Sequence, residues 1–234
     1  MQVISRMESK IGREIIKGVI KVSAFYFLLG VLMFTVSDRP DWWQAWAWLG
    51  IVIVEYIVML LILDPELMAE RSGVRKDAKR WDILLALLMS NLGTAIVMLV
   101  ASLDKRFGWS SPVPLYAMVA GIVLVIMGCA VVTWSMYSNK FFGPLVRIQK
   151  ERGHRVCSSG PYRFIRHPGY LGAIITYVGT PFMLGTLWAL VPVTLIMIDI
   201  VIRTALEDRT LQVELEGYIE FSARVKYRLL PGIW

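Results

Sequence analysis

The chain has 234 residues, of which 56% are hydrophobic, and its formal net charge is +7 at pH 7. A soluble domain of this length seldom reaches a mean hydropathy of +0.59, so the composition indicates a polytopic membrane protein. Excess positive charge is typical of the cytosolic loops of such proteins, and no basic–aromatic motif accompanies it, so nucleic-acid binding is not expected. The two cysteines, Cys129 and Cys157, form neither a disulfide framework nor a metal-binding pattern, and no metal is expected.

Four apolar segments are long enough to cross a bilayer, which takes roughly 20 residues. They cover about 19–36, 42–63, 82–102 and 113–137. The first lacks a small-residue cleavage site, so we interpret it as a retained helix and not as a signal peptide. The last apolar region, 169–203, is too long for one helix, and Gly185 interrupts it. We expect two shorter spans there, 169–184 and 187–203, which gives an all-α integral membrane bundle of about six helices (five to six) with a C-terminal helical hairpin.

The distribution of charge tests this arrangement. With both termini on one side of the membrane, 20 Lys and Arg residues lie on that side and three on the other. Positive residues concentrate on the cytosolic side, so both termini are expected to face the cytosol. We divide the chain into N-terminal transmembrane helices, 1–137, and a C-terminal part, 138–234, that holds most of the polar chemistry and a cytosol-facing pocket.

Several polar residues fall within the predicted spans. Glu55 lies near the middle of the second span, where a carboxylate is a functional candidate, although pairing within a helix bundle explains it equally well. Asp199, Arg203 and Glu207 are spaced by four, which places them on one face of a helix. They form either an ion ladder near the membrane interface or the polar wall of a cavity, in which Arg203 is available to an anionic substrate group.

The stretch GPYRFIRHPGYLG, residues 160–172, precedes the hairpin. Gly160-Pro161 and Pro168-Gly169 are turn signals, and the second pair starts the next helix. Because His167 precedes a proline, it should be extended or in a turn, with its imidazole near a helix N-terminus that favours an anion. The chain has no Walker loop, no G-x-S-x-G elbow and no HExxH motif, so any cofactor would be held by a helical, membrane-embedded site.

Three separated motifs occur in order: RIQKERGHRVCSSGPYRFIRHPGYLG at 147–172, R-x-x-x-E-D at 203–208, and YIEFSARVKYRLLPGIW at 218–234. Together they resemble the isoprenylcysteine carboxyl methyltransferase family, a group of integral-membrane methyltransferases related to the phospholipid methyltransferases. The likeness covers roughly 138–234. Two positions depart from the family pattern: Asp208 stands where a second Glu is common, and Phe221 where a second Tyr is usual.

The resemblance implies an S-adenosylmethionine site formed by the loop before the hairpin and the tail after it. Arg203 is implied to meet the substrate, and Arg203 and Glu207 are the implied catalytic residues. Gln149 or Arg147 completes the pocket, and the spacing leaves that choice open. The implied cofactor contacts are His154, Arg155, Val156, Cys157, Tyr162, His167, Pro168, Gly169, Tyr170 and Glu207.

The implied function is methyl transfer from S-adenosylmethionine, leaving S-adenosylhomocysteine, to a lipophilic or prenylated acceptor within the membrane lipid. Carboxyl O-methylation of an isoprenylcysteine-like substrate is the first expectation. N-methylation of a phospholipid or lipid amine is the alternative within the same class. A sterol-reductase-like membrane enzyme that uses NADPH, and a non-catalytic membrane protein, are the alternatives outside it.

Overall fold

In the computed structural model, which describes residues 2–73 and 77–234, every regular element within those ranges is helical. The expected all-α class is therefore confirmed. The α-helices are α1 (Gln2–Ser37), α2 (Trp43–Ile62), α3 (Pro65–Ser72), α4 (Arg80–Met89), α5 (Asn91–Phe107), α6 (Leu115–Ser138), α7 (Pro168–Leu184), α8 (Leu190–Glu214) and α9 (Tyr218–Arg224). Short 3₁₀ helices lie at Lys150–Arg152, Gly160–Arg163 and Leu187–Ala189.

Five segments of the described chain are long and apolar enough to cross a bilayer, in agreement with the predicted five to six spans. They are Ser9–Ser37, Trp43–Ile62, Arg80–Phe107, Leu115–Ser138 and Leu187–Glu214. The predicted fifth span corresponds to α7, whose 17 residues extend about 26 Å, slightly less than the hydrocarbon core. The predicted sixth span, 187–203, covers the last 3₁₀ helix and the apolar part of α8, and α8 continues beyond it to Glu214 with mostly polar residues.

The predicted third span, 82–102, is two helices separated by a break at Ser90, where φ is −102° and ψ is −108°. No proline causes the break. The carbonyl of Met89 leaves the helical hydrogen-bond pattern and accepts from the hydroxyl of Tyr177 on α7, at 2.5 Å. A side chain at Gly93 would collide with the carbonyl of Leu88, so the glycine permits the bend. The break turns α4 toward the loop that follows α6.

The closest helix pair is α6 and α7, which form one wall of the bundle. Gly121 and Gly128 on α6 face Gly179 and Gly172 on α7. A Cβ atom at Gly128 would lie 2.6 Å from the Gly172 carbonyl oxygen, and one at Gly121 would lie 2.8 Å from that of Gly179. Small residues let the backbones of membrane helices approach to van der Waals contact, which supplies much of their association energy.

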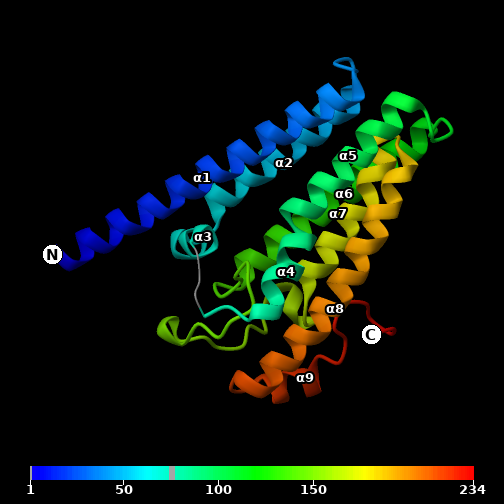
Figure 1. Cartoon of the computed structure of the whole chain (residues 1–234). Coiled ribbons are helices and arrows are strands. Elements are labelled where there is room, and N and C mark those ends of the chain that lie inside the picture. The colour runs from blue at the N-terminus through cyan, green and yellow to red at the C-terminus, as the bar shows by residue number, and fades with distance from the viewer. Residues whose placement is uncertain (1, 74–76) are drawn as a thin grey trace.

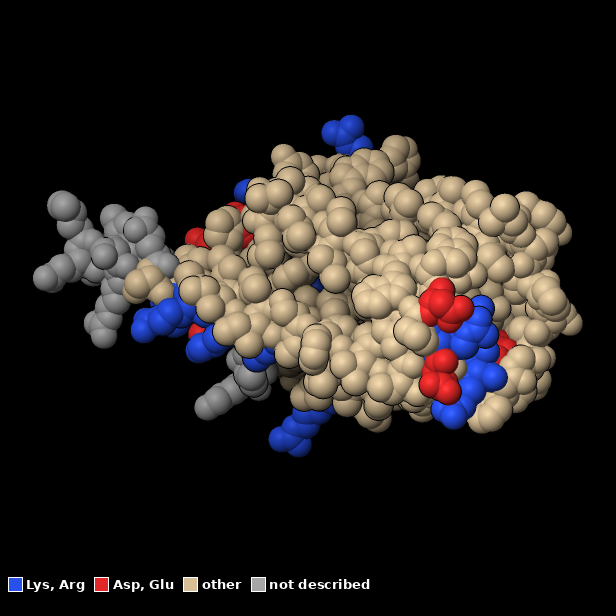
Figure 2. Space-filling view, turned by 90° about the horizontal axis from the view of Figure 1, so that it is seen from above, with Lys and Arg blue, Asp and Glu red and all other residues tan. Residues whose placement is uncertain are grey.

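The polar and charged segments gather at one end of the bundle. Figure 1 shows α3, α9 and the loop between α6 and α7 at that end, whereas the turns from α1 to α2 and from α5 to α6 lie at the other. Seen from above, the molecule presents mostly uncharged side chains, and the charged ones lie mainly toward its edges, including a cluster of both signs at the lower right (Figure 2). An uncharged surface of this kind suits contact with lipid.

Candidate active site

A cavity of about 500 Å³ lies at the α3–α9 end of the bundle, between the loop after α6, the start of α7, and parts of α4, α8 and α9. This volume falls within the usual range of ligand sites. The cavity brings together most of the residues that the sequence predicted for the site. Those that line it are Arg147, His154, Arg155, Val156, Cys157, Tyr162, His167, Gly169, Tyr170, Arg203 and Glu207.

Two predicted cofactor contacts lie behind the cavity wall. Pro168 is buried at the first position of α7, where its fixed φ starts the helix. Gln149 is buried beneath the loop: its amide donates to the Phe141 carbonyl at 2.8 Å and its oxygen accepts from Arg152 at 2.5 Å. Both residues shape the wall without reaching the cavity.

His154 stacks on the Phe141 ring, with 4.7 Å between ring centroids. Its Nδ1 atom accepts the backbone N–H of Gln149 at 3.2 Å, which requires that nitrogen to be unprotonated. Burial, and then the charges of Arg147 and Arg152, lower the pKa of His154 from 6.5 to about 4. The imidazole is therefore neutral near pH 7 and contributes an aromatic face to the cavity.

Tyr162 anchors the floor of the cavity on the 3₁₀ turn that begins at Gly160, a position with a φ of +56°. Its hydroxyl accepts from the Asn139 side chain at 3.4 Å, and burial raises the pKa of the phenol well above its usual value. Asn139 also lines the cavity and was not predicted. The Cys157 thiol donates to the Ser138 carbonyl at 3.1 Å, which ties the loop between α6 and α7 to the end of α6.

His167 is the N-cap residue of α7, with φ −125° and ψ 60°, so the prediction of a non-helical conformation is confirmed. Its imidazole, however, faces a carboxylate and not an open helix terminus. The Nε2 atom lies 3.2 Å from Asp208 Oδ1. The backbone N–H groups of Arg166 and His167 donate to the carbonyls of Tyr227 and Arg228, which fixes the tail beneath this turn.

Asp208 is the centre of this network. It is fully buried and accepts from Arg166 at 2.7 and 3.1 Å, from Arg228 at 2.9 Å, from Tyr218 at 2.9 Å and from Gln212 at 2.9 Å. From the sequence, Asp208 was expected only as a variant of the acidic pair. No short-range pattern signals the network, because its donors come from four segments of the chain.

Glu207 behaves differently from its neighbour. It is partly exposed, lines the cavity, and accepts a short hydrogen bond from the Tyr170 hydroxyl. A carboxylate can accept several hydrogen bonds, so Glu207 retains capacity for a ligand. The two adjacent acids thus have different roles: Asp208 forms hydrogen bonds within the cavity wall, and Glu207 lines the cavity.

Arg203 is buried and forms a bidentate ion pair with Asp82 of α4, at 2.6 and 3.0 Å. It also donates to the Pro144 carbonyl at 2.8 Å, and it lies over the Tyr170 ring, 5.4 Å from the centroid. Its partner is therefore neither Asp199 nor Glu207, the residues that would have formed the ion ladder. Asp199 is buried, with one carboxylate oxygen unpartnered within the described chain. Asp82 was missed because it lies 121 residues from Arg203.

Arg147 closes the cavity toward α3. Its guanidinium contacts Glu70 at 2.7 Å, Asp77 at 2.8 Å and Glu151 at 2.7 Å. Three carboxylates therefore surround this cation. Arg147, the alternative to Gln149, lines the cavity but mainly ties the loop between α6 and α7 to Glu70 and Asp77, which follow α2 in the chain.

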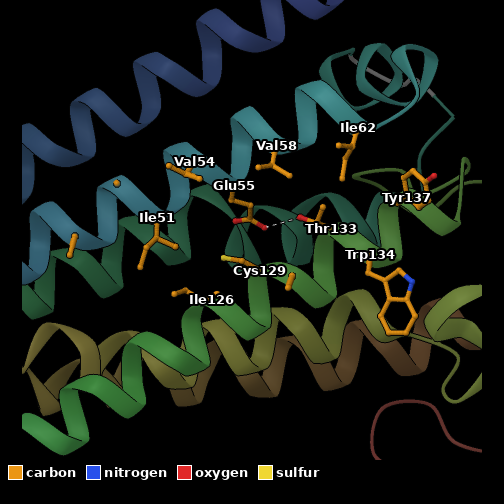
Figure 3. Close-up of a pocket in the computed structure, with 13 residues that line it drawn as sticks. Ile51, Val54, Glu55, Val58, Ile62, Ile126, Cys129, Thr133, Trp134 and Tyr137 are labelled. Atoms are coloured by element: carbon orange, nitrogen blue, oxygen red, sulfur yellow. Dashed lines mark hydrogen bonds between the residues drawn. The ribbon is translucent and has the colours of Figure 1, made fainter.

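A second, apolar groove of about 940 Å³ lies between α2 and α6 (Figure 3). Aliphatic and aromatic side chains form most of its wall. The exception is Glu55, which accepts a 3.4 Å hydrogen bond from Thr133, drawn as a dashed line in Figure 3. The groove contains the carboxylate singled out in the sequence, and it opens along helices long enough to span a bilayer.

Comparison with known proteins shows which families this chain resembles. Residues 116–214, which contain α6, α7 and α8, match the phospholipid methyltransferase family. A probable protein-S-isoprenylcysteine O-methyltransferase of Oryza sativa subsp. indica is 39% identical over 82 residues, which is 33% of this chain and 41% of that protein. The resemblance to the isoprenylcysteine carboxyl methyltransferase family is confirmed.

Two further members of the isoprenylcysteine methyltransferase family support this. Protein-S-isoprenylcysteine O-methyltransferase of Saccharomyces cerevisiae is 33% identical over 118 residues, 49% of this chain and 47% of that protein. Protein-S-isoprenylcysteine O-methyltransferase B of Arabidopsis thaliana is 33% identical over 69 residues, 27% of this chain and 33% of that protein. The chain spans less than half the length of these curated relatives. No solved structure matches it.

Proposed function

We propose that the protein is an S-adenosylmethionine-dependent membrane methyltransferase that methylates the carboxylate of an isoprenylcysteine-like acceptor. The observation that carries the proposal is the convergence on one 500 Å³ cavity of ten residues that the resemblance assigned to cofactor or substrate. The names of the relatives support the reaction class.

The cavity wall suits the proposed cofactor. Aromatic rings of His154, Tyr162 and Phe221 offer flat apolar surfaces for an adenine, and Glu207 offers acceptor atoms for an amine or a ribose hydroxyl. When bound, S-adenosylmethionine would supply a methyl group on a positively charged sulfur. The negative charge of Glu207 also favours a cation in this space.

The chain's own contribution is positioning and the exclusion of water. A carboxylate acceptor is nucleophilic without a general base, so neither histidine has to act as one. His154 is neutral and hydrogen-bonded to the backbone, and His167 is engaged by Asp208. Neither is needed to remove a proton from the acceptor.

The apolar groove between α2 and α6 is proposed to hold the lipid tail of the acceptor. It borders α6, the same helix whose Val132 and Met136 line the cavity. A membrane-embedded tail would therefore lie alongside the cofactor site. The cavity end is proposed to face the cytosol, because positively charged residues are concentrated in the segments at that end.

Binding of the cofactor to the detergent-solubilised protein tests the class of enzyme. We expect it to bind S-adenosylmethionine and S-adenosylhomocysteine, and not NADPH. Tight NADPH binding without sulfonium binding would replace the proposal with a reductase, and binding of neither would leave a non-catalytic protein.

Transfer of a labelled methyl group tests the acceptor. We expect transfer to a prenylcysteine, and none to phosphatidylethanolamine or a fatty acid. Transfer to phosphatidylethanolamine alone would show a lipid-amine methyltransferase.

A further inference from the structure

Arg71 stands apart from the other arginines of the cavity. It lies on α3, outside the segment that matches the family, and lines the cavity from that side. Arg147, Arg166 and Arg203 each form an ion pair with a buried carboxylate. Arg155, also at the cavity, is exposed to solvent.

The contacts of Arg71 leave its charge unneutralised. Its Nη1 atom donates to the Phe142 carbonyl at 3.4 Å, and its guanidinium lies 5.5 Å from the centroid of the Phe142 ring. No carboxylate pairs with it among residues 9–73 and 77–234, whose side chains the structure describes. A partly buried cation without a counter-ion is costly, and an anionic ligand would reduce that cost.

The electrostatic surroundings agree with this description. Burial, and then the charge of Arg203, lower the pKa of Arg71 from 12.5 to about 10. The guanidinium nevertheless stays charged at pH 7. Arg203 is already neutralised by Asp82 and bonded to the Pro144 carbonyl, so its donors are largely committed within the protein. Arg71 is therefore better placed than Arg203 to receive a carboxylate.

The position of Arg71 distinguishes the acceptor from the cofactor. Ile62, the last residue of α2, lines the apolar groove, and α3, which carries Arg71, begins three residues later. The groove end marked by Ile62 and Tyr137 lies next to α3 (Figure 3). The expected cofactor contacts lie instead on the loop 154–162, on α7 and at Glu207 of α8.

We propose that Arg71 binds the carboxylate of the methyl acceptor and thereby selects anionic amphiphiles over amines. This inference rests on the proposed methyltransferase function. One acceptor oxygen forms a bond to the methyl carbon as the methyl–sulfur bond breaks, and the electron pair of that bond stays on sulfur. The carboxylate and the sulfonium both become neutral, so no proton is transferred. The ester product no longer pairs with Arg71 and is released more readily.

The test compares Arg71→Gln and Arg71→Lys with Arg80→Gln, which removes the same charge from an exposed arginine at the start of α4. The acceptor is an N-acetylated farnesylcysteine, and its carboxamide and methyl ester serve as competitors. We expect Arg71→Gln to raise KM for the carboxylate by about tenfold or more, because a charge-assisted hydrogen bond is lost. Arg71→Lys should recover part of the loss, and Arg80→Gln should match the wild type.

Binding measurements separate the possible failures. The wild type should bind the carboxylate more tightly than the ester or the carboxamide, and Arg71→Gln should abolish that preference while its affinity for S-adenosylhomocysteine stays within about twofold. A tenfold loss of cofactor affinity would assign Arg71 to the cofactor's own carboxylate and overturn the inference. An unchanged KM in Arg71→Gln would also overturn it and leave the methyltransferase function intact. A wild type that transfers no methyl group to any acceptor would overturn the function itself.

Discussion

Two adjacent carboxylates at the end of α8 differ in everything but their place in the sequence. Asp208 is buried among two arginines, a tyrosine, a glutamine and a histidine, whereas Glu207 is partly exposed and accepts from Tyr170. A helix turns 100° per residue, so neighbours necessarily point to different environments. The pair therefore gives a matched comparison between a structural acid and a ligand-binding acid.

Asp208→Asn should destabilise the protein by about 3–5 kcal/mol, because it leaves Arg166 and Arg228 without their buried counter-charge. Thermal unfolding in detergent measures the change. Glu207→Gln is the control, and it should unfold at nearly the wild-type temperature. Equal destabilisation by both substitutions would contradict the division of roles.

Glu207→Gln should weaken binding of S-adenosylmethionine by about tenfold, because a neutral amide replaces a charged acceptor in the cavity wall. Titration calorimetry with S-adenosylhomocysteine checks this without turnover. Tyr170→Phe, which removes the hydroxyl that donates to Glu207, should have a smaller effect. Cofactor affinity that does not change in Glu207→Gln would exclude this residue from the cofactor site.

His154 should make stability depend on pH. In the folded protein its pKa is about 4, lowered from 6.5 by burial and by Arg147 and Arg152. The unfolded chain takes up a proton below about pH 6.5, and the folded chain does so only near pH 4. Between about pH 6.5 and pH 4, unfolding is therefore accompanied by proton uptake at His154. The free energy of unfolding should fall as the pH falls through this range. Thermal unfolding at pH 7 and pH 5 measures the decrease, and His154→Gln should reduce it.

At the scale of helices, the α6–α7 pair depends on glycine. Gly128→Ala should cost about 1–3 kcal/mol, because the added methyl group would lie 2.6 Å from the Gly172 carbonyl and force the helices apart. Gly50→Ala on α2 is the matched control, since nothing lies within 4 Å of the added atom there. That control should be neutral or slightly stabilising. Thermal unfolding of both variants tests this prediction. If Gly128→Ala is as stable as the control, close α6–α7 packing at Gly128 is contradicted.

The element scale also shows what local sequence can and cannot predict. Apolar runs and turn residues predicted the spans and the start of α7, since helix existence follows from local composition. The break at Ser90 was missed because no proline marks it, and its carbonyl partner Tyr177 lies on another helix. The Asp82–Arg203 pair was missed for the same reason: it forms only when α4 is turned against α8. Motif resemblance located the cavity residues, but it could not distinguish those in the wall from Gln149 and Pro168 behind it.

At the scale of the whole molecule, the charge distribution predicts orientation. Ser158 lies on the loop between α6 and α7, and Ser111 lies in the turn before α6 at the opposite end. In a background with Cys157 replaced, Ser111→Cys should react with a membrane-impermeant maleimide on intact cells. Ser158→Cys should react only after permeabilisation. The reverse pattern would place the cavity outside the cytosol.

The network around Asp208 also constrains how this sequence can change over time. Its donors lie before α7, on α8, on α9 and in the tail, so a replacement at any one of them alters the surroundings of all the others. Loss of the carboxylate would be tolerated only if both arginines changed with it. We therefore expect the residues at positions 166, 208, 218 and 228 to be substituted together, and not singly, among relatives.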